Sequence, residues 1–517
     1  MKKNLLTFMG VCLVAGGLQA QRYVTETFSS VTKTPDVTYG TNYYFIPLQG
    51  SPIAIGAPGA IPPLGYTPTQ GPISADFYEP TGDTETARPA VIIIHTGNFL
   101  PKYQNKSATG DKNDSVNVEL ANRFAKRGFV SISMRYRLGW NPLSASQEVR
   151  TGTILNAVYR AVHDVQTLVR FLKVNHSTYK IDTNRIILCG IGSGGYVSMA
   201  YTTLDKQTET ELFKFQDSGG NSVINPAYVG DVNGVGGAVN TYNHAGPTNK
   251  VAMEMNLGGA LGDQSWIEGG EGVKLGFHCW KDQFAPYDSG TVIVPVTGED
   301  VVDVHGTRTA VGKFVANGNN DPIVNFTFND VVSARAYAMN AKAQYEGLYE
   351  FRTGPGLSGA EQSSPWHWWD STSVDQMGVA LGAGPIHSNE LITNPNMSAA
   401  QGRAYIDTIM WYSIPRIVVA LGLPEAVYVG QAELNPTAQY GLEIFPNPSR
   451  GEVNIRVEND KVTRVDIIDI TGKTVWTTSL NGGKFISIDS GKLPAGTYIV
   501  SAKSADGKSE TKKLIIQ

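Results

Sequence analysis

The stretch Arg185-Ile186-Ile187-Leu188-Cys189-Gly190-Ile191-Gly192-Ser193-Gly194-Gly195 decides the fold of this chain. Its first half is a short apolar run, which is typical of a strand buried on both faces of a parallel sheet. Its second half is a glycine-rich turn, and the residues that follow, from Tyr196 to Leu204, predict a helix. A buried strand that passes through a tight turn into a helix is the repeating unit of an α/β sheet.

The same alternation of strand and helix continues on both sides of this stretch. Residues 152–173 place apolar side chains on one stripe, which predicts a long amphipathic helix. The other predicted elements are strands at 91–94, 129–134, 273–278 and 347–351, and helices at 118–126 and at about 399–421, the last interrupted or kinked at Pro415. Together they predict a doubly wound, mostly parallel sheet. Residues 21–88, rich in Gly, Pro, Thr and Tyr, predict irregular strands and loops.

The two ends of the chain differ from this central part. Lys2 and Lys3, the apolar stretch Leu5 to Leu18 and the small-residue site Leu18-Gln19-Ala20 predict a secretory signal peptide over residues 1–20. An uncleaved anchor is the alternative. Residues 441–517 carry short alternating runs separated by Gly, Asn and Asp, which predict a small all-β, immunoglobulin-like sandwich. The main domain is then 21–424 with an insertion near 288–340, and a linker covers 425–440.

Composition limits the classes of partner. The formal net charge is −4, without a basic patch, so nucleic acid is not an expected partner. Cys189 and Cys279 each fall at the end of a predicted core strand and are expected to be small buried residues, with their pairing left open. No cysteine or histidine spacing indicates a metal site, and neither a metal nor a cofactor is predicted.

The tail resembles the type A C-terminal sorting domain of the type IX secretion system. Four stretches carry the resemblance, in this order: Phe445-Pro446-Asn447-Pro448, Asp469-Ile470-Thr471-Gly472-Lys473, Leu493-Pro494-Ala495-Gly496-Thr497-Tyr498 and Lys512-Lys513-Leu514-Ile515-Ile516. The resemblance implies recognition by the type IX machinery, periplasmic transit, a secreted or surface-attached product, and removal of the tail. An ordinary β-sandwich binding module is the alternative.

The main domain is similar to the esterase branch of the α/β-hydrolases. In that branch a His-Gly-rich loop supplies backbone N–H groups for the oxyanion. His95-Thr96-Gly97-Asn98-Phe99 stands at this place, with Thr and Asn where glycines usually occur. The resemblance assigns Gly97, Asn98 and Gly194 to the oxyanion region.

The nucleophile elbow departs from the family pattern Gly-x-Ser-x-Gly. The alignment that puts Gly190 and Gly194 at the two small positions places Gly192, which has no side chain, at the nucleophile position. If Ser193 is the nucleophile instead, Ile191 occupies a position that normally takes a small residue. With Gly192 at the tip, Ser193 would supply a backbone N–H and a helix N-cap.

The resemblance also assigns an acid and a base. Asp282 follows a predicted strand in a loop like that of the family's triad acid, and His367 follows the last strand. The order Ser193, Asp282, His367 is the order of this fold. His387 is the reserve base, and His305 lies in the insertion. Loop capping by Asp282 and simple packing by His367 remain open, as do a structural and a ligand-binding role for Trp366, Trp368 and Trp369.

Three functions follow. The first is a secreted carboxylesterase in which Ser193 attacks, His367 acts as base and Asp282 orients it. The second is a catalytically silent protein that keeps the pocket for an ester or apolar ligand, with Gly192 at the nucleophile position. The third is a hydrolase in which another nucleophile has taken over.

Overall fold

The computed structural model describes residues 22–45, 68–294, 298–328, 330–339, 345–424 and 441–516, the last range with short gaps at 448, 450, 459–460, 470–472, 481–484 and 505–508. The predicted signal peptide and the predicted linker 425–440 lie outside the described residues. The chain forms two compact units that divide near Tyr428.

An eight-stranded sheet forms the centre of the first unit, in the order β1-β2-β4-β3-β5-β6-β8-β11. The strands are β1 (Val31–Tyr44), β2 (Thr69–Pro80), β3 (Arg88–Ile94), β4 (Val130–Met134), β5 (Ile181–Ile191), β6 (Met253–Leu257), β8 (Val273–Cys279) and β11 (Leu348–Phe351). β1 and β2 pair antiparallel, β2 pairs antiparallel with β4, and the strands from β4 to β11 are parallel. The predicted fold class is confirmed.

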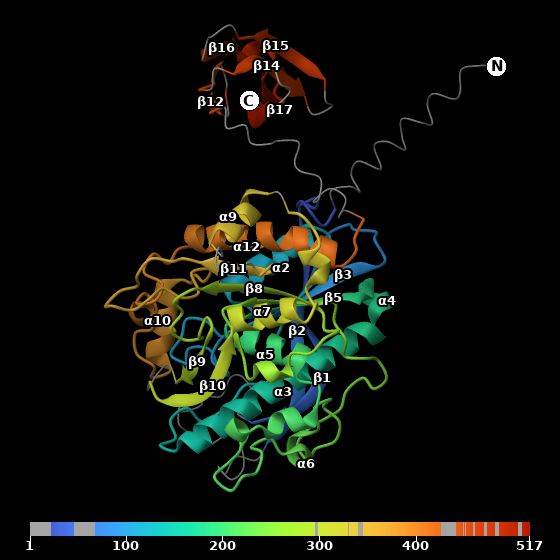
Figure 1. The fold of residues 1–517 in the computed structure, drawn as a ribbon, viewed down its shortest axis with the longest axis vertical. Coiled ribbons are helices and arrows are strands. Elements are labelled where there is room, and N and C mark those ends of the chain that lie inside the picture. The colour runs from blue at the N-terminus through green and yellow to red at the C-terminus, as the bar shows by residue number, and fades with distance from the viewer. Residues whose placement is uncertain are drawn as a thin grey trace, which may run out of the picture. The chain divides into compact units, whose positions relative to one another are not determined.

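Helices cover both faces of this sheet (Figure 1). α2 (Ser115–Lys126) and α12 (Ala399–Ala420) lie on one face, and α3 (Gln147–Val174), α5 (Ser193–Thr203) and α7 (Thr307–Ala316) lie on the other. The shorter helices are α4 (His176–Tyr179), α6 (Pro226–Val229), α8 (Asp321–Val324), α9 (Val331–Met339), α10 (Ser371–Ala380) and α11 (His387–Glu390). α12 runs on through Pro415, so the predicted interruption of this helix is wrong.

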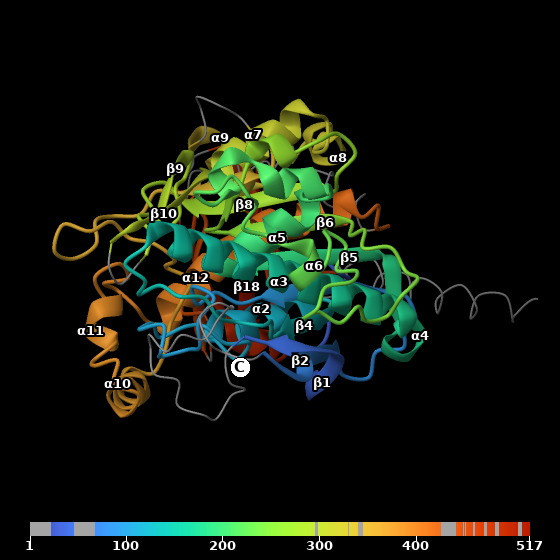
Figure 2. The same cartoon turned by 90° about the horizontal axis from the view of Figure 1, so that it is seen from below.

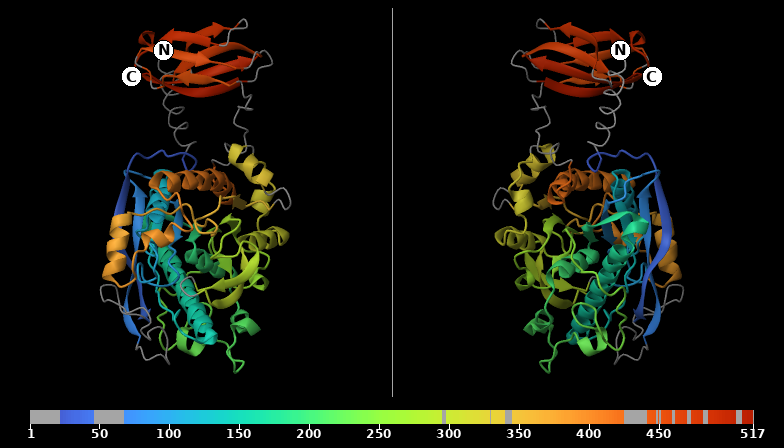
Figure 3. Two further views of the ribbon diagram at one scale, coloured as in Figure 1. Left: turned by 90° about the vertical axis from the view of Figure 1, so that its left-hand side faces the viewer. Right: turned by 90° about the vertical axis from the view of Figure 1, so that its right-hand side faces the viewer.

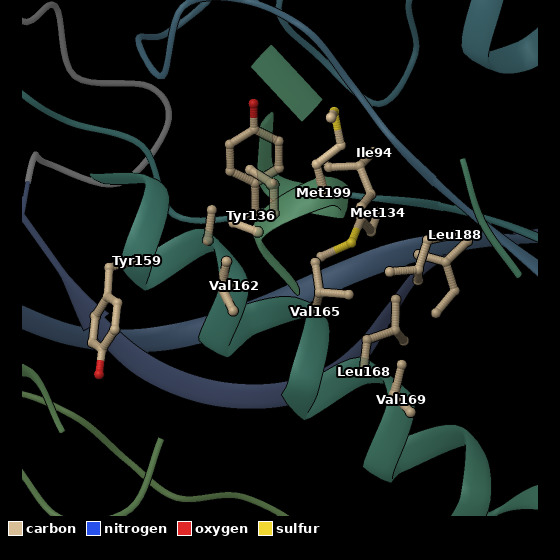
Figure 4. Packing of buried hydrophobic residues seen from close by; sticks show 14 of the residues in the cluster. Ile94, Met134, Tyr136, Tyr159, Val162, Val165, Leu168, Val169, Leu188 and Met199 are labelled. Carbon is tan, nitrogen blue, oxygen red and sulfur yellow. The ribbon is translucent and has the colours of Figure 1, made fainter. Parts of the chain in front are cut away.

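The long helix α3 packs its apolar stripe against the sheet. Val165 and Val169 of α3 lie beside Leu188 of β5 in the core (Figure 4). All three side chains are fully buried, and burial of such side chains contributes roughly 1.5–3 kcal/mol each. The hydroxyl of Ser146 accepts a hydrogen bond from the N–H of Val149 and caps the start of the helix. The sequence period therefore fixes which face of α3 meets the sheet.

A small second sheet stands at one end of this unit. It has the order β7-β10-β9, from β7 (Ala260–Leu261), β9 (Ser289–Ile293) and β10 (Asp300–Gly306). The hairpin β9–β10 lies at the same end of the unit as α10 and α11, while α4 lies at the opposite end (Figures 1 and 2). Because α4 precedes β5, the hairpin is at the carboxyl ends of the parallel strands, where ligands bind in such sheets.

Two parts of the sheet were not predicted from sequence. Residues 21–88, predicted to form irregular strands and loops, contain the long antiparallel pair β1–β2 in their described part. β6 was missed because Glu254 interrupts its apolar pattern. The Glu254 carboxylate is buried and accepts hydrogen bonds from Ser198 Oγ at 2.6 Å and Lys274 Nζ at 2.5 Å, so its charge is compensated inside the protein.

The second unit consists of two antiparallel sheets (Figure 3). The first has the order β12-β13-β16, from β12 (Glu443–Phe445), β13 (Glu452–Arg456) and β16 (Phe485–Asp489). The second has the order β15-β14-β17-β18, from β14 (Val462–Asp469), β15 (Thr474–Ser479), β17 (Gly496–Ser504) and β18 (Ser509–Ile516). Val453 and Ile488 of one sheet share a core with Ile467 and Val500 of the other. This is the predicted sandwich, with β12 and β13 added.

Candidate functional site

The elbow joins β5 to α5 through Gly192. Its φ of 53° and ψ of −117° belong to a region that residues with a side chain rarely adopt. A Cβ at Gly190 would lie 2.3 Å from the carbonyl oxygen of Gly194, and a Cβ at Gly194 would lie 2.1 Å from that of Ile94. The crowded positions are thus two residues before and two residues after Gly192. This geometry places Gly192 at the tip of the turn.

Ser193 is the first residue of α5 and is 7% exposed. Its Oγ accepts a hydrogen bond from the backbone N–H of Asn98 at 3.2 Å. The N-cap of α5 is Gly192, and Ser193 makes no side-chain cap contact, so the predicted capping role is wrong. The hydroxyl of Ser193 is instead directed at the loop after β3.

Thr96 fills the space that a side chain on residue 192 would need. A Cβ on Gly192 would lie 2.2 Å from Thr96 Oγ1 and 3.0 Å from Thr96 Cβ. No real Cβ sits that close to another heavy atom, so a serine at 192 and the observed position of Thr96 exclude each other. Thr96 Oγ1 makes no hydrogen bond to any residue of the described chain. Thr96 lines a cavity that Gly192 and Ser193 also line.

The loop from Thr96 to Phe99 is held in an unusual backbone conformation. Asn98 and Phe99 have φ values of 55° and 58°. Trp140 Nε1 donates to the carbonyl oxygen of Asn98 at 2.6 Å, and Asn105 Nδ2 donates to that of Gly97 at 3.1 Å. These bonds fix the loop, but they leave the Asn98 N–H pointing at Ser193 rather than open to an oxyanion.

Asp282 closes its own loop after β8. Its Oδ1 accepts hydrogen bonds from the N–H groups of Phe284 at 2.8 Å and Ala285 at 3.2 Å, which is the loop-capping role left open above. Its Oδ2 lies 3.9 Å from Nε2 of His278. Burial raises the pKa of Asp282 to about 7, against the opposing effect of the two backbone hydrogen bonds.

His367 lines the same cavity as Gly192, Ser193 and Asp282. Burial lowers the pKa of its imidazole to about 4, so the ring is neutral at physiological pH. Within the described residues, no hydrogen bond joins His367 to Asp282 or to Ser193. The structure therefore brings the three candidate catalytic residues to one cavity without a hydrogen-bonded relay between them.

The other late histidines lie outside this cavity. His387 accepts a hydrogen bond from Trp369 Nε1 at its Nδ1, over 3.1 Å. His305 of β10 accepts one from the N–H of Gln264, also over 3.1 Å. The three tryptophans diverge as well. Trp366 is in the core, Trp368 packs against Gly402 and Arg403 of α12, and Trp369 lines the cavity.

The cavity has a volume of about 600 Å³, which is in the range of small-molecule sites. It opens among the loops that follow β3, β5, β8 and β11 and extends between α3, α5 and the hairpin β9–β10. Sequence reasoning found the loops but missed the hairpin and the two helix faces as cavity walls. It also noted Thr96 only as a replaced glycine. The contact between Thr96 and Gly192 depends on tertiary packing, which no local sequence pattern reports.

Cys189 and Cys279 are both buried and unpaired. Burial raises the pKa of both thiols, so neither is a reactive thiolate. Among the residues that the structure describes, no cluster of histidine, cysteine and carboxylate side chains could hold a metal ion. In the same described part of the chain, no helix combines the length and the hydropathy that crossing a membrane requires.

Comparison with known families agrees with both units. Residues 75–268 match the model of the BD-FAE family, and residues 443–517 match that of the secretion system C-terminal sorting domain. The chain therefore contains an esterase-like α/β-hydrolase domain followed by a type IX sorting domain. The sorting domain implies recognition by the type IX machinery and marks the protein as one that is secreted and attached at the outer surface.

Several solved structures resemble parts of the chain. Apo Thermogutta terrifontis esterase 2 is 13% identical, covers 60% of this chain and 91% of its own, and has a TM-score of 0.30. The same esterase phosphonylated by cyclosarin is 15% identical, covers 42% of this chain and 69% of its own, and has a TM-score of 0.28. A truncated carbohydrate esterase from gut microbiota is 18% identical, covers 51% of this chain and 81% of its own, and has a TM-score of 0.28. Among curated proteins, none matches the chain.

Proposed function

We propose that this exported protein uses its esterase-like domain to bind a ligand in the cavity, without serine-based hydrolysis. One observation carries the proposal: the tip of the elbow is Gly192, which has no oxygen to attack a carbonyl. Thr96 occupies the space that a side chain at 192 would need, so the opposite wall fits a glycine at this position and not a serine.

The state of Ser193 supports the same proposal. Its Oγ accepts the Asn98 N–H, and no histidine of the described chain is hydrogen-bonded to it. In serine hydrolases the oxyanion hole and binding alone still accelerate the reaction by roughly 10³–10⁴ over water. In this protein we expect that residual acceleration to be smaller as well, because the Asn98 N–H is already hydrogen-bonded to Ser193 Oγ.

A serine esterase is the second candidate. The observation in its favour is that Ser193, Asp282 and His367 line one cavity. A rotation of the Ser193 side chain would release the Asn98 N–H and turn the hydroxyl into the cavity. This candidate requires His367 and Asp282 to come within hydrogen-bond distance when a substrate binds.

Ester hydrolysis separates the two candidates. The full chain and its Ser193→Ala variant are assayed with short p-nitrophenyl esters, and both are treated with a fluorophosphonate probe followed by peptide mass spectrometry. We expect both proteins to hydrolyse at the same background rate and to remain unlabelled. Hydrolysis that disappears in Ser193→Ala would establish the serine esterase. A label on Thr96 would identify a relocated nucleophile and would likewise overturn the binding proposal.

A further inference from the structure

One part of the cavity is lined by one face of each of two helices. From α3 come Ile154, Leu155, Val158 and Val162. Their spacing puts them on the face that turns away from solvent toward α5. Ile154, Leu155 and Val158 are only partly buried, so their apolar surface remains open inside the cavity.

α5 contributes Tyr196 and Ala200, and its C-cap residue Leu204 continues the row at the same interval of four residues. This row spans about 12 Å along the helix axis at 1.5 Å per residue. Tyr196 stands at the end nearest the elbow. Its hydroxyl is buried and has no hydrogen-bond partner among the described residues. The hydroxyl oxygen is enclosed by protein, so the surface that Tyr196 presents to the cavity is that of its ring.

The hairpin β9–β10 forms the opposite apolar wall, with Val292, Ile293, Val301 and Val302. It is fastened to the beginning of α3. Thr151 Oγ1 donates to the carbonyl oxygen of Val301 at 2.6 Å, and Arg150 pairs with Glu299 at 3.3 Å. Apolar side chains from the two helices and from the hairpin thus line one continuous part of the cavity, which is called the channel below.

The part of the cavity formed by the loops is polar and carries little positive charge. Asn98, Ser364 and Thr393 line it, and their side chains have no hydrogen-bond partner within the described residues. Lys106, which is exposed, is the one lysine or arginine among the described lining residues. Asp282 and Glu390 are the carboxyl groups there. An anionic head group would find no buried cation at this end, whereas hydroxyl groups would find several partners.

We infer that the cavity binds a single-chain amphiphile. Its alkyl chain lies between α3, α5 and the hairpin, and its uncharged, hydroxylated head faces the loops around Asn98 and Ser364. The inference rests on the proposed binding function and specifies its ligand class. The junction of chain and head lies near the elbow, where the apolar residues of α5 meet Gly192 and Ser193.

A chain-length series tests the channel. The full chain is titrated with hexyl, octyl and decyl β-glucoside, each below its critical micelle concentration, and with glucose as the ligand without a chain. Binding is followed by tryptophan fluorescence, since Trp140 and Trp266 line the cavity. We expect each added methylene to lower Kd about fourfold until the channel is full. A Kd that does not change with chain length would overturn the inference.

Two variants in the channel and one control locate the binding. Ala200→Phe should fill the channel and remove the dependence on chain length, and Val158→Thr should weaken the octyl ligand several-fold at nearly constant volume. Val379→Thr, at a position that is 66% exposed on α10 and outside the cavity, should change nothing. Thermal unfolding checks that each variant folds. Equal weakening in Val158→Thr and Val379→Thr would contradict a site in this channel.

The head group is tested with decanoate and decyltrimethylammonium, both of which should bind more weakly than decyl glucoside. A carboxylate that binds most tightly would overturn the uncharged head. The same samples are assayed with p-nitrophenyl decanoate. Hydrolysis that disappears in Ser193→Ala would refute the proposed non-catalytic function. The chain-length series would still show whether an amphiphile binds in the channel. Absence of both hydrolysis and chain-length dependence would end the amphiphile inference alone.

Discussion

At the elbow, two residues from different strand ends share the space of one side chain. Thr96 follows β3 and Gly192 follows β5, and a side chain at 192 would meet the hydroxyl of Thr96. Residue pairs that compete for one space show non-additive effects on stability. The pair therefore offers a way to test the geometry of the site without knowing the ligand.

We expect a double-mutant cycle to detect this competition. Gly192→Ser should destabilise the protein in two ways, through backbone strain at a φ of 53° and through overlap with Thr96, each at about 1–3 kcal/mol. In a Thr96→Gly background only the strain remains, so the cost should fall by roughly the overlap term. Urea unfolding of the four proteins measures both costs. Equal costs in the two backgrounds would show that Thr96 does not occupy the space.

Asp282 provides a second prediction, on pH. In the unfolded chain its pKa is about 3.9, whereas burial raises it to about 7 in the folded protein. Between these values the folded state retains a proton that the unfolded state loses, so stability falls as pH rises. Asp282→Asn keeps the acceptor for Phe284 and Ala285 but cannot ionise.

The stability of Asp282→Asn relative to the parent should therefore increase as pH rises. We expect the difference in unfolding free energy, Asp282→Asn minus parent, to be near zero at pH 4 and to approach about 4 kcal/mol by pH 8 as an upper bound. Chemical unfolding at intervals of pH measures it. The titration of His367 occurs in both proteins and cancels. A difference that stays constant over this range would mean that Asp282 is ionised in the folded state.

The residue scale also shows where sequence reasoning ends. The small positions around Gly192 were readable, because a glycine pattern directly reports crowding. The hydrogen bond between Asn98 and Ser193 was not, since it joins residues 95 positions apart through the packing of β3 against β5. The catalytic roles of Asp282 and His367 stay predictions. Their shared cavity follows from chain order, but a working relay depends on distances of a few tenths of an ångström.

At the scale of elements, apolar runs predicted the central strands well because those strands are buried on both faces. β6 escaped because its polar residues are satisfied by partners distant in sequence. Asn256, like Glu254, is fully enclosed: its Nδ2 donates to Thr307 Oγ1 at 2.7 Å, and its Oδ1 accepts the N–H of Gly259 at 2.8 Å. No period in the sequence reports such pairing.

Two glycines in helices of the same unit give a prediction at this scale. Gly194 is the second residue of α5, and a Cβ there would lie 2.1 Å from the backbone of β3. Gly152 lies in α3, and a Cβ there would meet Val223 at an ordinary 3.6 Å. Gly152→Ala should stabilise the protein by about 0.5–1 kcal/mol through helix propensity. Gly194→Ala should destabilise it by about 3 kcal/mol or more, because backbone cannot move aside as a side chain does.

Denaturant unfolding of the two variants against the parent measures this contrast. The same substitution in two helices isolates the steric effect from propensity. If Gly194→Ala were as stable as Gly152→Ala, the close packing of the elbow against β3 would be wrong, and with it the placement of Gly192 at the tip.

At the scale of the whole molecule, the chain joins an esterase-like α/β-hydrolase domain to a type IX sorting domain. The second unit has its own core, in which both sheets participate, so we expect it to fold without the first unit. The esterase-like match ends at residue 268 and the sorting match begins at residue 443. This separation is what a removable tail requires, since removal leaves the cavity and its lining residues intact.

The last prediction concerns this removal. Because the sorting domain addresses the protein to the type IX machinery and contributes no residue to the described cavity, we expect the mature protein to begin near Gln21 and to end between Pro424 and Leu442. Intact-mass and terminal-peptide spectrometry of the surface protein measures both ends. Deleting residues 441–517 should leave the main domain folded, with the same thermal unfolding as the mature protein, but retained in the periplasm. A change confined to the cavity, such as Val158→Thr, should leave export unchanged and serves as the control. Surface protein that keeps Lys512-Lys513 at full yield would show that the tail remains part of the working molecule, and the β-sandwich would then have to be considered a binding module in its own right.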